Sequence, residues 1–190
     1  MAKKRHKSAY QKATRALEKE GYKQCMLLYS AAALALYRHW GKRKQAIISL
    51  FDLTGDVWRT CSEDSMLSMI QMCEDETGIE IQNSSGKSWR DLPYLNATID
   101  NKQYTSAQWI YMRHRQKEWI AAQVMACIMV GLHRKYGFGF DRCARIYQQI
   151  RDIEAEYNFD EKKLQEACKA EALVNVYDVI TQKKEPGKVV

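Results

Sequence analysis

Proline is almost absent from this chain, and this scarcity constrains the fold more than any other feature of the sequence. Only Pro93 and Pro186 occur among the 190 residues. Because proline removes a backbone donor and interrupts helices, long stretches without it are free to form uninterrupted helices. Apolar residues recur at helical spacing through most of these stretches, whereas strand-like alternation is limited to residues 79–81. We therefore predict an all-α fold.

Glycines and capping residues divide the chain into helical segments. Gly21 is expected to end a first short basic helix, and Gly41 lies where a helix C-terminal cap is expected. Asp160 can cap the last helix, whose first turn carries an acidic residue. The helices are expected at residues 22–40, 44–53, 64–75, 106–136, 140–157 and 161–177, with a continuation of the second past Gly55 to Cys61 left open.

A weak internal repeat relates positions that are 96 residues apart. Without gaps, Trp40 aligns with Tyr136 and Gly41 with Gly137. We predict a helical bundle of two similar halves, residues 1–76 and 106–182, joined by an irregular loop or small hairpin over 77–105 and followed by a tail over 183–190. The helical hairpins 22–61 and 118–157 would then be equivalent. Chance similarity between two amphipathic hairpins is the alternative.

Charge is distributed unevenly along the chain, which carries a formal net charge of +7. Lys and Arg outnumber Asp and Glu in residues 1–60 and 106–150, whereas acidic residues dominate residues 61–105. Alternating blocks of this kind predict a positive surface with a negative counter-surface, suited to phosphate groups or to an acidic protein. Solvated faces of bundle helices are the alternative.

The cysteines and the apolar runs bear on the cellular compartment. No C-x-x-C pair and no zinc-finger spacing occurs among Cys25, Cys61, Cys73, Cys127, Cys143 and Cys168. We therefore expect reduced thiols, no metal and no cofactor. The longest apolar run, residues 25–36, is shorter than the ~20 residues that a spanning helix needs. No apolar segment follows the basic N-terminus. We expect a cytoplasmic protein without membrane contact.

Two short patterns are shared with catalytic motifs, but each lacks an essential part. Gly137-Phe-Gly139 lacks the third glycine and the preceding strand of a dinucleotide-binding loop. His114 and Glu118 lack the second histidine of a metalloprotease helix. No Ser/His/Asp or Cys/His set can be argued from the spacing. The sequence therefore predicts a protein that is not an enzyme and has no catalytic residues.

Basic residues gather at three places where a partner could bind. The candidate binding residues are Arg38, Lys42, Arg43 and Lys44 across the first glycine turn, Arg113 and Arg115 on the long helix, and Arg142, Arg145 and Gln149 after the second glycine turn. The last three follow i, i+3, i+7 spacing on a face turned away from the apolar stripe. A helix, a short glycine turn and a helix that begins with Arg form a helix-turn-helix-like layout. Arg can bond guanine edges and Gln adenine edges in a major groove. A solvated helix face is the alternative.

The second glycine turn also carries a resemblance. Residues 132–146, Leu-His-Arg-Lys-Tyr-Gly-Phe-Gly-Phe-Asp-Arg-Cys-Ala-Arg-Ile, resemble a segment of small uncharacterised proteins from phages and prophages of Gram-positive bacteria. In those proteins a Gly-Phe-Gly stretch leads into a basic amphipathic helix. The resemblance implies an origin in a mobile element. Small phage proteins of this type include replication accessories, regulators and inhibitors of host defence such as anti-CRISPR proteins.

Charge, motifs and resemblance together favour action by stoichiometric binding to a nucleic acid or a nucleoprotein. The most specific expectation is an inhibitor, in the bacterial host cytoplasm, of a nucleic-acid-guided defence nuclease such as a CRISPR effector. Two alternatives stay open. One is a helix-turn-helix-like DNA- or RNA-binding accessory of replication or regulation. The other is a structural homo-oligomer, in its smallest form a homodimer.

Overall fold

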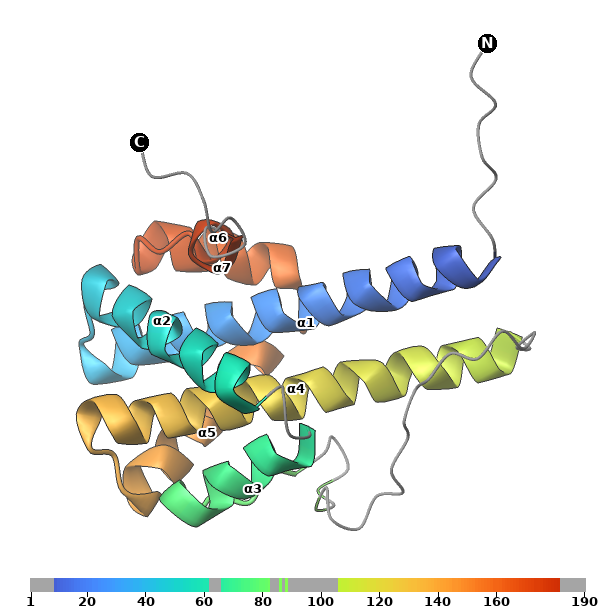
Figure 1. Ribbon diagram of the computed structural model, residues 1–190. Helices are drawn as coiled ribbons and strands as arrows, with labels where there is room; N and C mark the ends of the chain where they lie inside the picture. Colours follow the sequence, from blue (N-terminus) through green and yellow to red (C-terminus); the bar gives the residue numbers. More distant parts are fainter. Residues whose placement is uncertain (1–8, 62–65, 83–85, 87, 89–105, 182–190) are drawn as a thin grey trace, which may run out of the picture.

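Seven helices form the described part of the protein. The computed structural model describes residues 9–61, 66–82, 86, 88 and 106–181. Its helices are α1 (Ala9–Trp40), α2 (Lys44–Cys61), α3 (Met66–Thr77), α4 (Ser106–Tyr136), α5 (Phe140–Glu156), α6 (Glu161–Glu171) and α7 (Val176–Thr181) (Figure 1). Within these ranges no β-strand forms, and one isolated antiparallel bridge joins Gln82 to Ser88. The predicted all-α class is confirmed. The rest of the connecting segment, 83–105, lies largely outside the described residues, as does the tail, 183–190.

The two long helices, α1 and α4, lie side by side and run in the same direction (Figure 1). Arg113 contacts Glu20 towards their N-terminal ends, and Phe138 contacts Trp40 just beyond their C-terminal ends. The other helices pack around the C-terminal two thirds of this pair. Helix α2 and helix α3 pack on α4, whereas α5 and α6 pack on α1. The N-terminal parts of α1 and α4 therefore extend beyond the bundle (Figure 1), and we call them, up to residues 21 and 118, the stalk, because Tyr22 and Trp119 already pack against the core.

The core is built from the middle of the two long helices. Every residue from Met26 to Leu36 of α1 is buried, and so is every residue from Ala122 to Leu132 of α4. A helix that is apolar on all sides needs partners on all sides. The covering helices supply these partners, and one continuous apolar cluster results.

Gly21 does not end a helix, which corrects the prediction of a short basic helix before it. Helix α1 continues through Gly21, which is buried. A Cβ atom at this position would overlap Cδ1 of Ile120 on α4. The absent side chain therefore lets the two stalk helices approach closely, and this packing compensates the roughly 1 kcal/mol helix penalty of glycine.

The last predicted helix is interrupted. Helix α6 begins as predicted, because the Asp160 side chain accepts the backbone N–H groups of Lys162 and Lys163. It ends at Glu171, and Leu173 takes a positive φ of 56° with its side chain exposed. Val174 is buried behind this turn and donates its N–H to the Cys168 carbonyl. The chain restarts as the short helix α7.

Helix positions follow the offset of 96 residues seen in the sequence. Moving the bounds of α1 and α2 by this offset gives 105–136 and 140–157, against the observed Ser106–Tyr136 and Phe140–Glu156. Gly41 and Gly137, which the offset pairs, take positive φ angles of 59° and 64°. The two predicted halves do not pack as separate units within the described residues. The first helix of each half packs mainly on helices of the other half.

Candidate nucleic-acid interface

The two glycine turns meet at one end of the bundle. The ring of Trp40, before the first turn, lies 4.7 Å from the ring of Phe138 in the second. Conversely, Lys42 Nζ lies 4.3 Å from the ring centre of Tyr136, whose hydroxyl donates to the Ala46 carbonyl at 2.9 Å. Each turn therefore packs on the last aromatic residue of the other long helix. We call this region, residues 41–46 and 137–145, the turn end.

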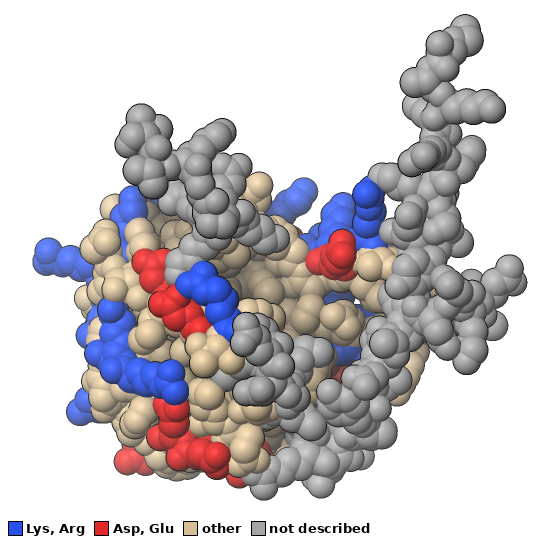
Figure 2. Space-filling view, viewed as in Figure 1, with Lys and Arg blue, Asp and Glu red and all other residues tan. Residues whose placement is uncertain are grey.

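Four exposed cations lie at the turn end. They are Arg43 and Lys44 at the start of α2 and Arg142 and Arg145 in the first turns of α5. Among the described residues no acidic side chain forms an ion pair with any of them. Figure 2 shows Lys and Arg side chains along the left edge of the molecule, over this end. One carboxylate, that of Asp141, lies in the first turn of α5.

Two helix N-termini add to this positive charge. Helix α2 has no acidic residue in its first turn, and no side chain caps α5 at Gly139. The first N–H groups of a helix lack intrahelical partners, and the helix dipole makes this end positive. Such ends favour anions, phosphate groups among them. The turn end therefore offers phosphate two dipole ends and four exposed cations.

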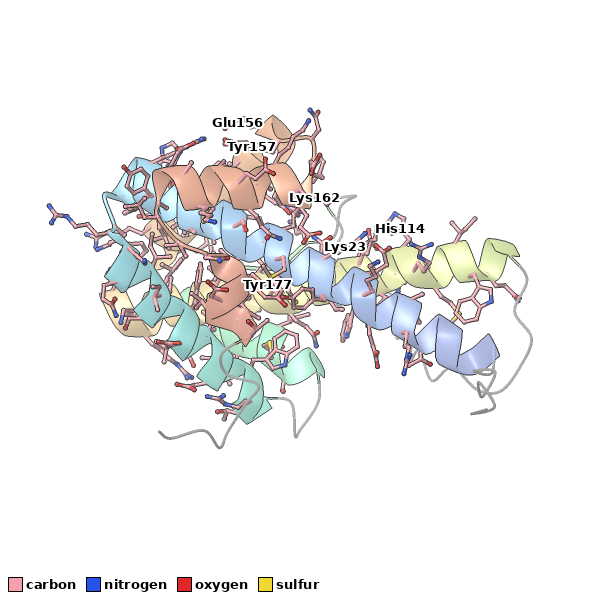
Figure 3. All side chains as sticks on the ribbon, turned by 90° about the horizontal axis from the view of Figure 1, so that it is seen from above. Lys23, His114, Glu156, Tyr157, Lys162 and Tyr177 are labelled. Atoms are coloured by element: carbon pink, nitrogen blue, oxygen red, sulfur yellow. The ribbon has the colours of Figure 1, made fainter. Side chains whose placement is uncertain are left out.

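Arg38, one of the predicted binding residues, is engaged in intramolecular hydrogen bonds and ion pairs. Its guanidinium forms two hydrogen bonds with Glu171, at 2.8 and 2.7 Å, and a third to the Tyr157 hydroxyl at 2.9 Å. It also pairs with Glu156 at 3.0 Å. Figure 3 labels Glu156, the last residue of α5, and Tyr157, which follows it. Hydrogen bonds from Arg38 lower the pKa of Glu171. Arg38 thus joins α1 to the C-terminal ends of α5 and α6.

Gln149 is likewise engaged inside the bundle. Its side-chain carbonyl accepts the indole N–H of Trp40 at 2.8 Å, and the residue is half-buried. The predicted common face of Arg142, Arg145 and Gln149 is therefore incomplete. Only the two arginines are exposed. Gln149, which the helix-turn-helix-like hypothesis expects to bond adenine, is already bonded to Trp40. Arg142 also lies 5.8 Å from the ring centre of Phe138, which supports its side chain over the turn.

The remaining predicted residues lie elsewhere. Arg113 donates to Glu20 at 2.6 Å in the stalk, and Lys117 pairs with the same carboxylate at 3.1 Å. Arg115 is half-buried on the same helix. From Arg113 to the end of α4 the helix rises ~35 Å. The predicted residues therefore do not form one surface, and Lys42, Arg43, Lys44, Arg142 and Arg145 are the set that the turn end brings together.

We next considered the cysteine thiols and the groups that could hold a metal ion among the described residues. Five cysteines are free thiols, and burial raises the pKa of Cys73 and Cys168 to about 12 and that of Cys143 to about 11. Thiols with such pKa values are weak nucleophiles at neutral pH. In the described part of the chain, no three His, Cys, Asp or Glu side chains are grouped to hold a metal ion. No described helix is long and apolar enough to cross a membrane.

Comparisons with protein-family models, with curated proteins and with solved structures found no match.

The structure also contains a groove that the sequence did not predict. It is lined by Glu154 and Phe159 among others. Neither residue belongs to a motif. The turn after α5 brings the two residues together, and the neighbouring helices α1 and α4 supply much of the remaining lining.

Proposed function

We propose that this chain acts by stoichiometric binding to a nucleic acid or a nucleoprotein, with the turn end as the contact surface. The observation that carries the proposal is the meeting of the two glycine turns. It groups Arg43, Lys44, Arg142 and Arg145, all exposed and without acidic partners among the described residues, at two neighbouring helix N-termini. Cations and dipole ends of this kind suit the phosphates of a nucleic-acid backbone.

The double variant Arg142→Gln and Arg145→Gln tests the proposal. Titration of labelled single-stranded and duplex oligonucleotides at several salt concentrations should show that parental affinity falls steeply with salt. Each neutralised phosphate contributes a slope of about 0.9 for duplex DNA. Loss of two phosphate contacts should therefore reduce the slope by roughly 2 and weaken binding uniformly across sequences.

A matched control removes two exposed cations elsewhere. Lys162→Gln and Lys163→Gln make the same charge change on α6, outside the turn end, and should leave the salt slope near that of the parent. All four substitutions are at exposed positions, which usually change stability by about 0.5 kcal/mol or less. The assignment of the turn end would be contradicted if the affinity of the parent did not change with salt concentration. It would also be contradicted if both double variants lost the same affinity.

The most specific form of the proposal is inhibition of a nucleic-acid-guided defence nuclease, as the resemblance of residues 132–146 implies. Such a nuclease presents phosphate-rich guide and target strands, which match the charge of the turn end. Target cleavage by a purified guided nuclease should stop when the protein reaches a fixed molar ratio to the nuclease. The double arginine variant should need a higher ratio. If several types of guided nuclease still cleave their targets fully when the protein is in excess, the inhibitor proposal is wrong and only the general nucleic-acid proposal stands.

A further inference from the structure

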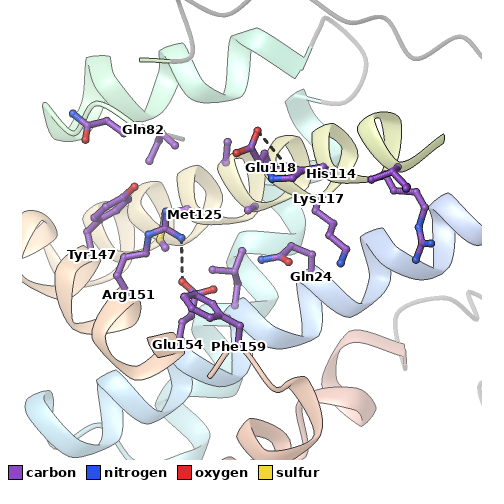
Figure 4. Close-up of a pocket in the computed structure, with 16 residues that line it drawn as sticks. Gln24, Gln82, His114, Lys117, Glu118, Met125, Tyr147, Arg151, Glu154 and Phe159 are labelled. Atoms are coloured by element: carbon purple, nitrogen blue, oxygen red, sulfur yellow. Dashed lines mark hydrogen bonds and ion pairs between the residues drawn. The ribbon is translucent and has the colours of Figure 1, made fainter. Parts of the chain in front are cut away.

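A groove separate from the turn end opens where α4 leaves the bundle. Its volume is about 480 Å³, and it lies between α1, α4 and α5, with residues 81 and 82 on its rim (Figure 4). The floor is apolar and is formed by Leu28, Ala122 and Met125. A volume of this size suits a small organic ligand or one unit of a polymer.

Glu154 places an unsatisfied acceptor in this groove. Its side chain is 1% exposed. Oε2 accepts from Arg151 Nη1 at 3.2 Å, whereas Oε1 is buried at the groove wall without a hydrogen-bond partner in the described structure, so a ligand reaches it only when the atoms that cover it move. Figure 4 shows the carboxyl group pointing into the groove beside Phe159. A buried acceptor without a partner costs free energy, which a ligand donor would recover.

The charges near Glu154 determine which kind of ligand group could donate a hydrogen bond to it. Arg151 already neutralises the Glu154 carboxylate, and Arg113 and Lys117 line the same groove from α4. A second cation next to Glu154 would therefore be repelled. A neutral N–H group is the suitable donor. Arg113 and Lys117 both pair with Glu20, so an anionic group on the ligand would compete with this carboxylate for the two cations.

Phe159 provides a flat apolar surface next to this acceptor. Its side chain lines the groove and is 60% exposed. Its backbone φ is 56°, following 52° at Asn158, although positive φ is rare for bulky residues. The N–H of Phe159 donates to the Glu154 carbonyl at 2.8 Å. One strained turn thus fixes the aromatic ring and the buried carboxylate side by side, and such strain is concentrated at functional sites.

We propose that this groove binds a nucleobase that carries an exocyclic amine. The amine would donate to Glu154 Oε1, the base would stack on Phe159, and the phosphate would face Lys117 and Arg113. A nucleobase combines the flat apolar face, the neutral donor and the linked anion that the groove requires. The base can come from a free nucleotide or from a single strand. The site does not depend on the turn end.

The test uses adenosine monophosphate and purine riboside monophosphate, which lacks the 6-amine, in calorimetric titrations of the full chain. A hexamer of deoxyadenylate tests the strand as the source. The parent should bind at least one amine-bearing probe and discriminate against the amine-free analogue. Phe159→Ala should weaken binding by about 5- to 150-fold, the range of one stacking contact. Glu154→Met should abolish the discrimination, which a merely structural role of Glu154 would not affect.

Matched controls separate this groove from other surfaces. Tyr111→Ala removes a comparably exposed aromatic side chain, 53% exposed, that lies outside both the groove lining and the turn end, and should leave affinity unchanged. The Arg142→Gln and Arg145→Gln variant should also retain binding of adenosine monophosphate. Binding of the hexamer alone would support a strand as the source. The proposal is overturned if the parent binds no probe at millimolar concentration, or if discrimination persists in Glu154→Met.

Discussion

Gly131 is a residue whose size the core limits. It is buried in α4, and a Cβ atom there would lie 2.9 Å from Cγ2 of Thr54 and 3.1 Å from Cδ1 of Leu50. Thr54 cannot rotate away easily, because its hydroxyl donates to the Phe51 carbonyl and bonds the Tyr29 hydroxyl. Gly131→Ala should therefore lower the free energy of unfolding by about 1–2 kcal/mol, despite alanine's helix preference of about 1 kcal/mol. Urea denaturation measures this change.

Thr54→Ser provides the control for this prediction. It removes the opposing methyl group and keeps the hydroxyl that bonds Phe51 and Tyr29. In the Thr54→Ser background the closer contact of the added methyl is gone and only that with Cδ1 of Leu50 stays, so Gly131→Ala should cost clearly less stability than in the parent. An equal loss of stability in both backgrounds would show that the contact with Thr54 is not the cause.

Two glutamates should affect stability with opposite signs as the pH changes. Burial raises the pKa of Glu154 above its usual 4.5, whereas hydrogen bonds from Arg38 lower the pKa of Glu171. As the pH rises above about 4.5, ionised Glu154 destabilises the fold, so Glu154→Gln should gain stability relative to the parent. Ionised Glu171 stabilises the fold, and this contribution is lost as the pH falls below 4.5. Glu171→Gln should therefore be less stable at neutral pH and approach the parent in acid. Denaturation curves at pH 3 to 8 would contradict this if both variants shifted alike.

At the scale of the helices, α3 and α6 end in a similar way with different residues. Gly78 follows α3 with a φ of 72°, and Leu173 follows α6 with a φ of 56°. The next residue is buried in each case, and its carbonyl accepts a cysteine thiol, from Cys73 at 3.8 Å and Cys168 at 3.4 Å. The two ends differ in one hydrogen bond, because Val174 donates its N–H to the Cys168 carbonyl whereas Ile79 donates its N–H to the Thr77 hydroxyl. Both need a positive φ, but only the first has the residue that suits it.

Leu173→Gly should therefore stabilise the protein by about 1 kcal/mol, because it relieves backbone strain. The side chain is 64% exposed, so little burial is lost. Gly78→Ala is the reciprocal change and should destabilise by a similar amount or more, since its Cβ would also lie 3.1 Å from Phe140. Thermal unfolding compares both with the parent. Destabilisation by Leu173→Gly would show that the leucine side chain has a packing role.

These helix ends also show how far the sequence allowed prediction. Gly41 and Gly137 end their helices as predicted, because their role is local. The role of Gly21 depends on Ile120, about a hundred residues away, and the turn at Leu173 has no local signature. The same limit applies to the candidate site. Nothing in the run Arg38 to Lys44 tells that Arg38 is bound by Glu171 whereas Arg43 is exposed.

For the whole molecule, each of the two long helices packs mainly on helices that are distant in sequence. Helix α1 packs on α5 and α6, and α4 packs on α2 and α3, whereas contacts of each long helix with its own second helix are few. The ion pairs follow the same rule. Arg38 forms a bidentate pair with Glu171, and Arg134 forms one with Glu76. Each half therefore completes the core of the other.

This packing predicts that neither half folds alone. A fragment of residues 1–82 would expose the apolar stretch from Met26 to Leu36, and a fragment of residues 106–190 would expose that from Ala122 to Leu132. Each should lack a cooperative thermal transition in circular dichroism, whereas an equimolar mixture should recover the transition in a one-to-one complex, measured by sedimentation. Leu132→Asp in the second fragment should prevent recovery, because it buries a charge in the shared core. A monomeric fragment that unfolds cooperatively by itself would show that the halves are independent domains.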